Sequence, residues 1–457
     1  MIRRMVTNPM PPFPAGFLWG VSTSAHQIEG AVKEREPSVW DVFTAEPGRV
    51  RDGSTAAVAC DHYHRHREDV ALLAGLGVNA YRFSVSWPRV NVPGGLDFYD
   101  RLVDDLCAAG IRPVPTLFHW DLPATLDWLE RDTAARFAEY VSVVAARLGD
   151  RTQQWITLNE PAEHTLLGHA LGVHAPGKRL LFDALPAAHH QLLAHGLAVQ
   201  ALRAAGATDI GIANSHGPVW PASGDRADVE AADLYDVLLN RMFAEPVLLG
   251  AYPQPVGDLL SDGTRDVEAD LRVIAEPVDF YGVNYYAPAR VGAPQGTGTA
   301  FGGVPLPAGL PFSLRKIEGR PLTDSGWPVV PEGLTELLTG FRDRYGDRLP
   351  PVVITENGCS GEGLDDQDRI TYLDAHLRAL HRAIEAGVKV RGYFVWSLLD
   401  NFEWAEGYAR RFGLVHVDHD TLTRTPKASY AWFRQVLRAQ RSRDGAGIRP
   451  RGDAAGR

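Results

Sequence analysis

Short apolar runs alternate along the chain with longer stretches in which apolar residues recur every three or four positions. The short runs have the length of strands, and the longer stretches have the period of helices with one buried face. Gly or Pro separates many of them. We expect strands at residues 17–22, 80–85, 111–118, 155–158, 209–213, 280–283, 352–355 and 392–397. We expect helices at residues 61–76, 96–109, 133–148, 185–205, 228–243, 331–345, 366–386 and 427–438.

Eight strand–helix alternations predict a single (β/α)8 barrel, an α/β fold with a parallel core and long loops at its rim. A doubly wound sheet is the main rival. That fold more often carries a glycine-rich phosphate-binding turn after its first strand. The nearest candidate, GTGTAFGG from Gly296, lacks the third glycine in the required place and precedes no helix. The pattern therefore favours the barrel.

The barrel is expected to occupy residues 14–440, after an N-terminal extension at residues 1–13. Residues 287–324 are rich in Gly and Pro and too long for a passive connection, which predicts a lid or rim loop over the barrel mouth. Residues 441–457 contain few apolar side chains, so we expect a disordered tail.

Composition narrows the choice of partner. Of the 457 residues, 45% are hydrophobic and 22% are charged, as in ordinary globular enzymes, and the formal net charge is −10. An acidic surface disfavours nucleic acid and anionic membranes as partners, which leaves a small molecule. The start of the chain has no continuous apolar segment, and Cys60, Cys107 and Cys359 show no pairing pattern. We therefore expect a cytoplasmic protein with reduced cysteines.

Polar and aromatic side chains stand where the predicted strands end. The carboxyl ends of parallel barrel strands meet at one mouth, which is the catalytic face of such barrels. Amides and carboxylates bind hydroxyl groups, and indole rings stack on the apolar face of a sugar, so the set predicts a sugar site. Its members are Gln27, His119, Asn159, Glu160, Asn284, Tyr286, Glu356 and Trp396.

Glu160 and Glu356 supply the two carboxyl groups that cleavage of a glycosidic bond needs, one as an acid and one as a nucleophile or base. They come after strands on opposite sides of the predicted mouth. A separation of about 5–5.5 Å gives retention of configuration and about 6.5–9.5 Å gives inversion, and at this point both outcomes stay open. A carboxylate at a strand end can also cap a helix or pair with Arg. Considered alone, either glutamate could have such a structural role instead.

Six sequence blocks resemble glycoside hydrolase family 1, the β-glucosidase family, in order and spacing over residues 14–436. They match bacterial members. The blocks are FLWGVSTSAHQIEGA from Phe17, TLFHWDLP from Thr116, WITLNEP from Trp155, FYGVNYY from Phe280, VVITENG from Val352 and GYFVWSLLDNFEWAEGYARRFGLVHVD from Gly392. The resemblance implies a retaining β-glycosidase that releases a terminal β-D-glycosyl residue through a covalent glycosyl-enzyme, without metal or cofactor.

The resemblance also implies roles for individual residues. Glu160 is expected to be the acid/base and Glu356 the nucleophile. Arg82 and Tyr286 would orient Glu356 and keep it ionised by lowering its pKa, and Asn284 would serve the acid/base side. The expected sugar-binding residues are Gln27, His119, Trp120, Asn159, Trp327, Trp396, Glu403, Trp404 and Phe412. Glu403 beside Trp404 would repel a phosphate, which implies a non-phosphorylated sugar.

Some positions depart from the family pattern, and all of them concern the side of the leaving group. Ala162 comes after the NEP block where many relatives have Trp, and Cys359 comes after ENG. Residues 90–98 are shorter than usual, residues 127–131 lack Gly-Gly-Trp, and the loop at 359–367 is compact. We expect an open aglycone side that suits a bulky acceptor or natural-product glycoside. A transglycosylase or natural-product deglycosylase with the same two glutamates is the alternative function, and a sugar-binding pseudoenzyme would be expected to lose Glu160 or Glu356.

The remaining histidines and tryptophans have simpler interpretations. His62, His64 and His66 lie within one helical turn but lack an acidic partner at the spacing of a zinc motif, so a helix start is favoured over a metal site. His189, His190 and His195 are expected to be packing or surface residues on a helix. Core positions are expected for Trp19, Trp87, Trp155 and Trp432.

Overall fold

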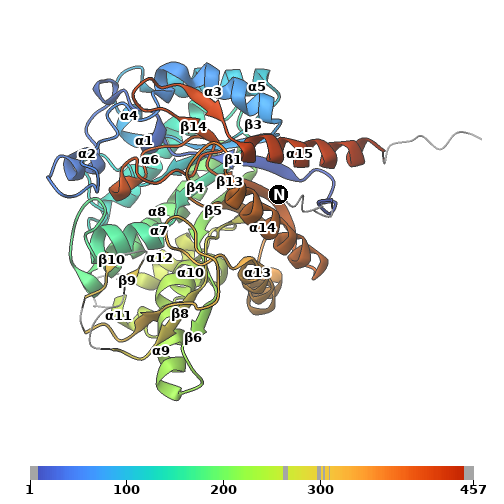
Figure 1. Cartoon of the computed structure of the whole chain (residues 1–457). Helices are drawn as coiled ribbons and strands as arrows, with labels where there is room; N and C mark the ends of the chain where they lie inside the picture. Colours follow the sequence, from blue (N-terminus) through green and yellow to red (C-terminus); the bar gives the residue numbers. More distant parts are fainter. Residues whose placement is uncertain (1–8, 261–265, 296–299, 302–303, 308, 447–457) are drawn as a thin grey trace, which may run out of the picture.

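Eight parallel strands form a closed barrel in the computed structural model, which describes residues 9–260, 266–295, 300–301, 304–307 and 309–446 (Figure 1). Each strand pairs with the strands before and after it in the barrel, and β1 closes the ring on β13. The strands are β1 (Leu18–Ser22), β2 (Ala80–Ser84), β3 (Arg112–Phe118), β4 (Gln154–Asn159), β5 (Asp209–Ser215), β7 (Phe280–Asn284), β12 (Val352–Asn357) and β13 (Val390–Trp396). The predicted (β/α)8 fold is confirmed.

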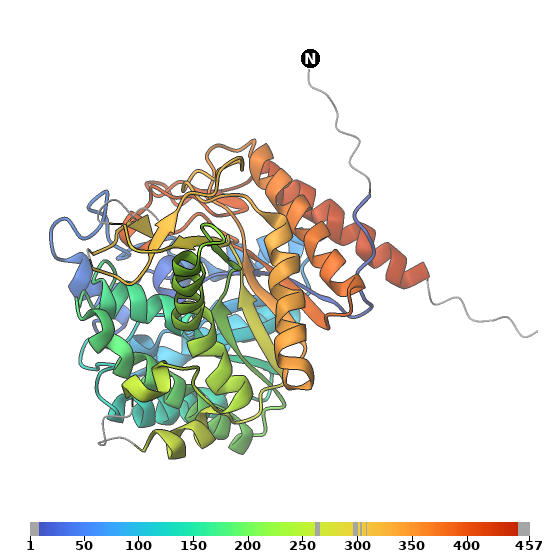
Figure 2. The same cartoon turned by 90° about the horizontal axis from the view of Figure 1, so that it is seen from below.

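Helices surround the barrel, as Figure 2 shows from a second direction. The long ones are α3 (His62–Leu76), α5 (Gly95–Ala108), α6 (Asp132–Leu148), α8 (Leu185–Ala204), α13 (Pro331–Tyr345), α14 (Gln367–Glu385) and α15 (Ala428–Ala446). The helix predicted at residues 228–243 is longer, because α9 (Arg226–Asp236) continues through a π-helical turn at Val237–Arg241 into α10 (Met242–Leu249). The sequence pattern did not predict α12 (Val267–Ile274), which has only eight residues.

Short helices lie in the loops, where no periodicity revealed them. They are α1 (Ala25–Ile28), α2 (Val39–Thr44), α4 (Trp87–Val90), α7 (Pro161–Glu163) and α11 (Val256–Leu260). A π-helical segment at His164–Ala170 comes after α7, and 3-10 turns occur at Val32–Glu34, Leu181–Ala184, Gly346–Arg348 and Trp404–Glu406.

The barrel interior changes from apolar to polar along its axis. Every barrel strand contributes one residue to an apolar ring, composed of Leu18, Ala80, Val114, Ile156, Ala213, Phe280, Val353 and Phe394. Side chains two positions further along a strand point to the same side. On β2, β3 and β12 those positions hold Arg82, Thr116 and Thr355, all fully buried. The ring therefore forms the floor beneath a polar layer.

The long rim segment at 287–324 is more ordered than a lid loop. β8 (Ala289–Gly292) pairs with β6 (Val219–Pro221) and with β11 (Ser313–Arg315), and β9 (Ala300–Phe301) pairs with β10 (Val304–Pro305). Val291 and Phe312 pack against Tyr235 of α9. Most of the glycine-rich GTGTAFGG stretch lies outside the described residues. This part of the rim is thus a small sheet anchored on a helix.

The two ends of the described chain pack together. Met10 and Phe13 are buried, and the backbone N–H of Phe13 donates to Gln440 on α15 (3.1 Å). α15 extends to Ala446, so the first six residues of the predicted tail are helical. Residues 1–8 and 447–457 lie outside the described residues. A last small sheet pairs β14 (Val415–Val417) with β15 (Arg424–Pro426).

The helix-start histidines serve structural contacts. The Nδ1 atom of His62 lies 2.8 Å from the buried carboxylate of Asp69, which also binds Arg424 (3.0 Å). Asp61 precedes α3, and its carboxylate lies 2.6 Å from Nδ1 of His64 and does not cap the helix backbone.

The other predicted structural residues also lie in packed positions. His189, His190 and His195 are buried on α8, as are Trp19, Trp87 and Trp155 in the core, while Trp432 is half-buried. Over the described residues, no helix has the length and apolar character that crossing a membrane requires.

Candidate active site

The carboxyl ends of the barrel strands carry the two predicted glutamates. The strand pairing shifts register at the end of β4, between Ile156 and Asn159, and at the end of β12, between Ile354 and Glu356. Such irregularities bend a strand and re-aim its side chains. Glu356 points into the polar layer, and Glu160 begins the turn into α7.

Glu356 is held by two donors and is 3% exposed. The Arg82 guanidinium donates to its Oε1 (2.6 Å), and the Tyr286 hydroxyl donates to its Oε2 (2.8 Å). Arg82 also donates to Thr116 (3.0 Å) and to the carbonyl of Thr355 (3.1 Å). The carboxylate is thus fixed in position and faces a fully buried cation.

A chain of amides connects Glu356 to Glu160. Arg82 donates to Oδ1 of Asn159 (2.6 Å), which also accepts from Asn284 (3.0 Å). The same Asn284 amide donates to Oε1 of Glu160 (2.8 Å). The two carboxyl groups therefore belong to one buried hydrogen-bond network, with the cation at the Glu356 end.

The network fixes the proton on His119. Since Oδ1 of Asn159 accepts from two donors, its amide nitrogen donates to Nε2 of His119 (3.1 Å). Burial and the charge of Arg82 hold the pKa of His119 well below its usual range, so the ring is neutral and protonated on Nδ1. Among the described residues Nδ1 has no partner, which leaves one N–H to donate to a ligand.

A second polar group forms around Gln27 on the opposite wall. Its amide donates to Asn401 (3.1 Å), to the carbonyl of Phe402 (3.0 Å) and to Glu403 (3.1 Å). Burial, together with the charge of Glu356, raises the pKa of Glu403 to about 8. Glu403 is therefore mostly protonated at neutral pH, so the predicted like-charge repulsion of a phosphate is weaker than the sequence suggested.

Aromatic rings lie beside these polar groups. His119 stacks at 5.7 Å from Trp396 and 6.0 Å from Trp404, and Trp120 lies 4.7 Å from Trp404. The indole of Trp120 donates to the carbonyl of Asn159 (3.0 Å). Across the mouth, Trp327 contacts Tyr286 (5.4 Å) and Phe412 (6.1 Å). The structure thus brings together all fourteen residues that the sequence singled out.

Three residues of this region have strained backbones. Glu160, Trp120 and Trp404 all adopt left-handed conformations, with φ of +47°, +76° and +53°. Such conformations cost free energy in non-glycine residues and persist only where the surroundings impose them. Here they belong to three of the residues that form the candidate site.

Burial sets the protonation of both glutamates. Burial and the charge of Glu356 raise the pKa of Glu160 well above its usual range. Burial also raises the pKa of Glu356, although Arg82 and Tyr286 act to lower it. The expectation of a lowered pKa for Glu356 is therefore wrong in its net direction, because desolvation outweighs the two donors. The pKa of Glu160 is nevertheless raised further than that of Glu356. Glu356 therefore loses its proton first, and its negative charge keeps Glu160 protonated.

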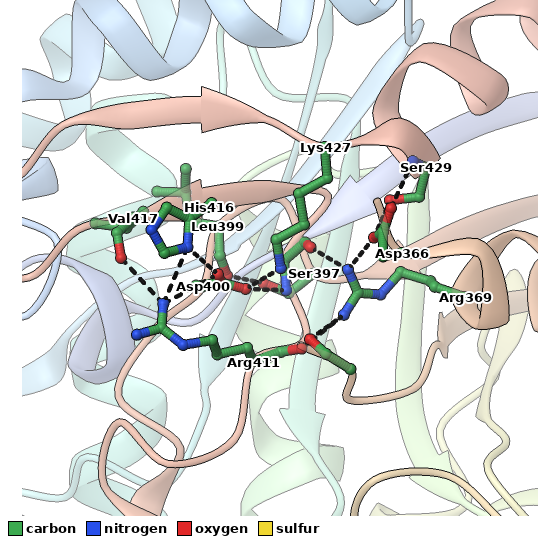
Figure 3. A network of polar contacts seen from close by, with 12 residues as sticks. Asp366, Arg369, Ser397, Leu399, Asp400, Arg411, His416, Val417, Lys427 and Ser429 are labelled. Atoms are coloured by element: carbon green, nitrogen blue, oxygen red, sulfur yellow. Dashed lines mark hydrogen bonds and ion pairs between the residues drawn. The ribbon is translucent and has the colours of Figure 1, made fainter. Parts of the chain in front are cut away.

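Buried charges hold the loop from Asp400 to Gly413, which carries Glu403, Trp404 and Phe412. Figure 3 shows the contacts of Asp400, Lys427 and Arg369. Asp400 accepts from Lys427 (2.7 Å) and from the backbone N–H of Gly413 (2.9 Å). Asp400 and Lys427 are 0% and 2% exposed. Asp400 at the start of the loop thus contacts Gly413 at its end, and Lys427, just before α15, pairs with Asp400.

Arg369 on α14 links this loop to the segment after Glu356. It donates to the carbonyls of Gly413 (2.6 Å) and Arg411 (2.6 Å) on one side and of Cys359 (3.2 Å) on the other. Its charge is paired with Asp366, which also binds Ser429. Sequence reasoning missed Arg369 and Asp400, since nothing in an amphipathic helix or a loop marks a side chain that turns inward.

Other supporting residues were also missed. Thr355 donates to Oδ1 of Asn284 (2.6 Å), and Ser24 donates to Gln27 (2.6 Å). Thr355 had a signal, because it directly precedes Glu356 on the strand. Glu163 is a third carboxyl group near the pair, and burial raises its pKa to about 7.

Comparison with known proteins agrees with this geometry. The model of "Glycosyl hydrolase family 1" matches residues 10–442. The chain belongs to glycosyl hydrolase family 1. Family 1 is a retaining family that acts on β-glycosides, which confirms the predicted family and the predicted class of enzyme.

Characterised relatives align over nearly their whole length. Thermostable β-glucosidase B of Thermobispora bispora is 46% identical, over 95% of this chain and 92% of its own. The family 1 β-glucosidase of Thermotoga maritima superposes with a TM-score of 0.87 at 40% identity, over 95% and 99% of the two chains, and it has also been solved with glucoimidazole. A psychrophilic β-glucosidase from Micrococcus antarcticus gives a TM-score of 0.88 at 43% identity, over 95% and 99%.

The Asp400–Lys427 pair yields a prediction for this family 1 enzyme. Asp400→Asn keeps the shape of the side chain but leaves a buried cation without its counter-charge, which costs roughly 3 kcal/mol of stability. Because the loop carries Glu403 and Trp404, KM for a β-glucoside is expected to rise severalfold. Thermal unfolding and steady-state kinetics measure the two effects.

Asp324→Asn is the matched control, since Asp324 is half-exposed and pairs with Arg410 (2.8 Å) at the surface. Surface pairs contribute about 0–1 kcal/mol. Equal behaviour of the two variants would contradict the role given to Asp400.

Proposed function

We propose that the protein is a retaining β-glucosidase in which Glu356 is the nucleophile and Glu160 the acid/base. The observation that carries the assignment is the unequal environment of the two carboxyl groups. Glu356 touches a buried cation and a phenol, whereas Glu160 is buried against a neutral amide. The ionised group attacks and the protonated group donates.

The first step forms a covalent intermediate. An oxygen of Glu356 bonds to the anomeric carbon, the bond from that carbon to the glycosidic oxygen breaks, and Glu160 gives its proton to that oxygen. An alcohol leaves. In the second step water attacks the same carbon from the side that the alcohol left, Glu160 takes a proton from the water, and the ester bond to Glu356 breaks. Two inversions give net retention.

The sugar-binding roles are inferred from the polar and aromatic groups gathered at the strand ends. Nδ1 of His119, the amide of Gln27 and the carboxyl of Glu403 are placed to bind hydroxyl groups, and Trp396 offers a flat face for the ring. A glucose residue is the sugar we propose, which the likeness to an enzyme solved with glucoimidazole supports. A buried carboxyl group is a poor place for a phosphate dianion, so the sugar is not phosphorylated.

Transglycosylation with the same two glutamates is the alternative activity, and it differs only in whether water or an alcohol resolves the intermediate. A sugar-binding pseudoenzyme is disfavoured, since both carboxyl groups are present and connected by one network. We keep a cytoplasmic location as a proposal. It is supported by the absence of disulfides at Cys60, Cys107 and Cys359.

Removing either carboxyl group tests the roles. Glu356→Ala is expected to lower kcat/KM for an aryl β-glucoside by about 10⁴-fold or more. Glu160→Ala should cost about 10²–10⁴-fold with a poor leaving group and much less with dinitrophenolate, which leaves without a proton. Added azide should give the α-glucosyl azide with Glu356→Ala and the β-glucosyl azide with Glu160→Ala.

Glu245→Ala serves as the control, because Glu245 is a buried carboxylate paired with Arg241 outside the cavity. It should retain most of the activity. Azide products of the opposite configurations would exchange the two roles, and undiminished activity in both variants would contradict the mechanism.

The pH dependence is set by the two pKa shifts. Below the pKa of Glu356 the nucleophile is protonated and inactive, and burial moves this acid limb above the ordinary carboxyl range. Above the pKa of Glu160 the acid is lost, which gives the alkaline limb. For Glu160→Gln acting on dinitrophenyl β-glucoside, the kcat/KM profile should keep its acid limb and lose its alkaline limb. If the alkaline limb persists near pH 8 in this variant, the group that titrates there is Glu403 and not Glu160.

A further inference from the structure

A third carboxyl group, that of Glu163, follows Glu160 by one helical turn. Pro161 begins α7, where its fixed backbone angle suits the first helical position, and the backbone N–H of His164 donates to the carbonyl of Glu160 (3.0 Å). Side chains three positions apart on a helical turn are neighbours. The turn therefore places a second carboxyl group beside the acid/base.

Two adjacent barrel strands hold these carboxyl groups close together. Glu160 accepts from the amide of Asn284 at the end of β7 (2.8 Å), and Glu163 is hydrogen-bonded to Ser215 at the end of β5. Ser215 and Asn284 are direct partners in the parallel pairing of β5 with β7. Adjacent strands lie about 4.8 Å apart. The groups that anchor the two carboxyls are thus neighbours at the barrel mouth.

Glu163 differs from Glu356 in having no cation beside it. Burial raises the pKa of Glu163 to about 7, the hydrogen bond from Ser215 acts to lower it, and over the described residues no Lys or Arg contributes to the shift. Glu163 is partly exposed, whereas Glu160 is 7% exposed. Glu163 therefore gains its negative charge above about pH 7, while Glu160 still holds its proton.

The charge of Glu163 acts on the proton of Glu160. Burial and the charge of Glu356 raise the pKa of Glu160 most, and the charge of Glu163 raises it further, while Asn284 and Arg82 lower it. Once Glu356 is esterified to the sugar, its charge is gone. Glu163 remains ionised in that intermediate, so it continues to raise the pKa of Glu160 when Glu356 no longer does.

Other titratable groups near these carboxyls do not change charge together with Glu163. Burial and the charges of nearby glutamates raise the pKa of Tyr286, beside Glu356, and of Tyr235 on α9, near Glu163. Both phenols are therefore neutral over the range in which Glu163 titrates. Glu403, whose pKa is raised to about 8, lies on the Gln27 side of the site.

We propose that Glu163 is a positioning residue for the proton of Glu160. Its charge holds the proton on Glu160 until the glycosidic oxygen receives it, and it makes Glu160 a stronger base when water attacks the glycosyl-enzyme. In that second step the water oxygen bonds to the anomeric carbon, its proton moves to Glu160, and the ester bond to Glu356 breaks. The inference rests on the roles proposed for Glu160 and Glu356.

A pH profile tests the first part of the proposal. Glu163→Gln keeps the size of the side chain and removes its charge. With phenyl β-D-glucoside, whose leaving group needs a proton, the alkaline limb of kcat/KM should move to lower pH by about half a unit or more, because a like charge no longer raises the pKa of Glu160. Glu163 is protonated below its pKa, so the acid limb should coincide with that of the wild type.

Dinitrophenyl β-D-glucoside tests the second part. Its leaving group departs without a proton, so attack of water limits kcat. Above the pKa of Glu163, Glu163→Gln should lower kcat about twofold or more, because Glu160 is a weaker base. KM should fall by the same factor and kcat/KM should stay unchanged. A variant that merely disturbed the sugar site would raise KM instead.

Three further variants serve as matched comparisons. Glu163→Leu also removes the charge and should reproduce both effects. Glu163→Asp retains a charge on the same turn and should restore most of the wild-type behaviour. Glu268→Gln removes one charge from an exposed pair with Arg272 on α12 (3.0 Å) and should change neither measurement. Circular dichroism verifies that each variant is folded.

The outcomes separate the role of Glu163 from the function beneath it. Hydrolysis whose alkaline limb and KM are the same in the wild type, Glu163→Gln and Glu163→Leu would overturn the inference and leave the β-glucosidase intact. An equal shift in Glu268→Gln would overturn it as well. Absence of all β-glycoside hydrolysis would instead refute the proposed function. In that case the titration of Glu160, followed as the infrared carboxyl signal that Glu160→Gln lacks, still tests the inference, and an identical titration in Glu163→Gln would overturn it.

Discussion

The buried guanidinium of Arg82 is the interaction on which the active site depends. It lies in the barrel interior two residues above the apolar ring, with no exposed surface. A charge in that place is tolerable only with a counter-charge and with partners for its N–H groups. Glu356 supplies the charge, and Thr116, Asn159 and the carbonyl of Thr355 supply the remaining acceptors. The fold therefore requires an ionised carboxylate at this point.

That requirement explains how two glutamates in one cavity acquire different tasks. The cation at one end stabilises the charge on Glu356. Burial and this charge then raise the pKa of Glu160, although the hydrogen bond from Asn284 acts to lower it. Loops that contribute the sugar-binding groups are tied to the same region by Arg369 and by the Asp400–Lys427 pair. Electrostatic pairs deep in the protein thus position groups at the barrel mouth, where catalysis needs fixed geometry.

The sequence predicted the barrel and the residues at its strand ends, but not the contacts that hold the loops of the site. Strand ends such as Thr355–Glu356 and Asn159–Glu160 were predictable because buried strands leave a clear apolar pattern, and the residues at their carboxyl ends gather at the barrel mouth. Contacts made by loop and helix residues were not predictable, and Arg369, Asp400 and the small sheet at 287–324 were missed for that reason. The net pKa of Glu356 depends on how far burial opposes Arg82, which no sequence pattern reports.

The most direct test of the central claim is to trap the glycosyl-enzyme. A 2-deoxy-2-fluoro-β-D-glucoside with a dinitrophenolate leaving group should react once, because the fluorine slows both steps and the activated leaving group restores only the first. We predict that the mass of the protein rises by one fluoroglucosyl group, and that the label lies on the peptide containing Glu356. A label on Glu160, or turnover of an aryl β-glucoside that releases α-glucose first and leaves no trapped intermediate, would contradict the account.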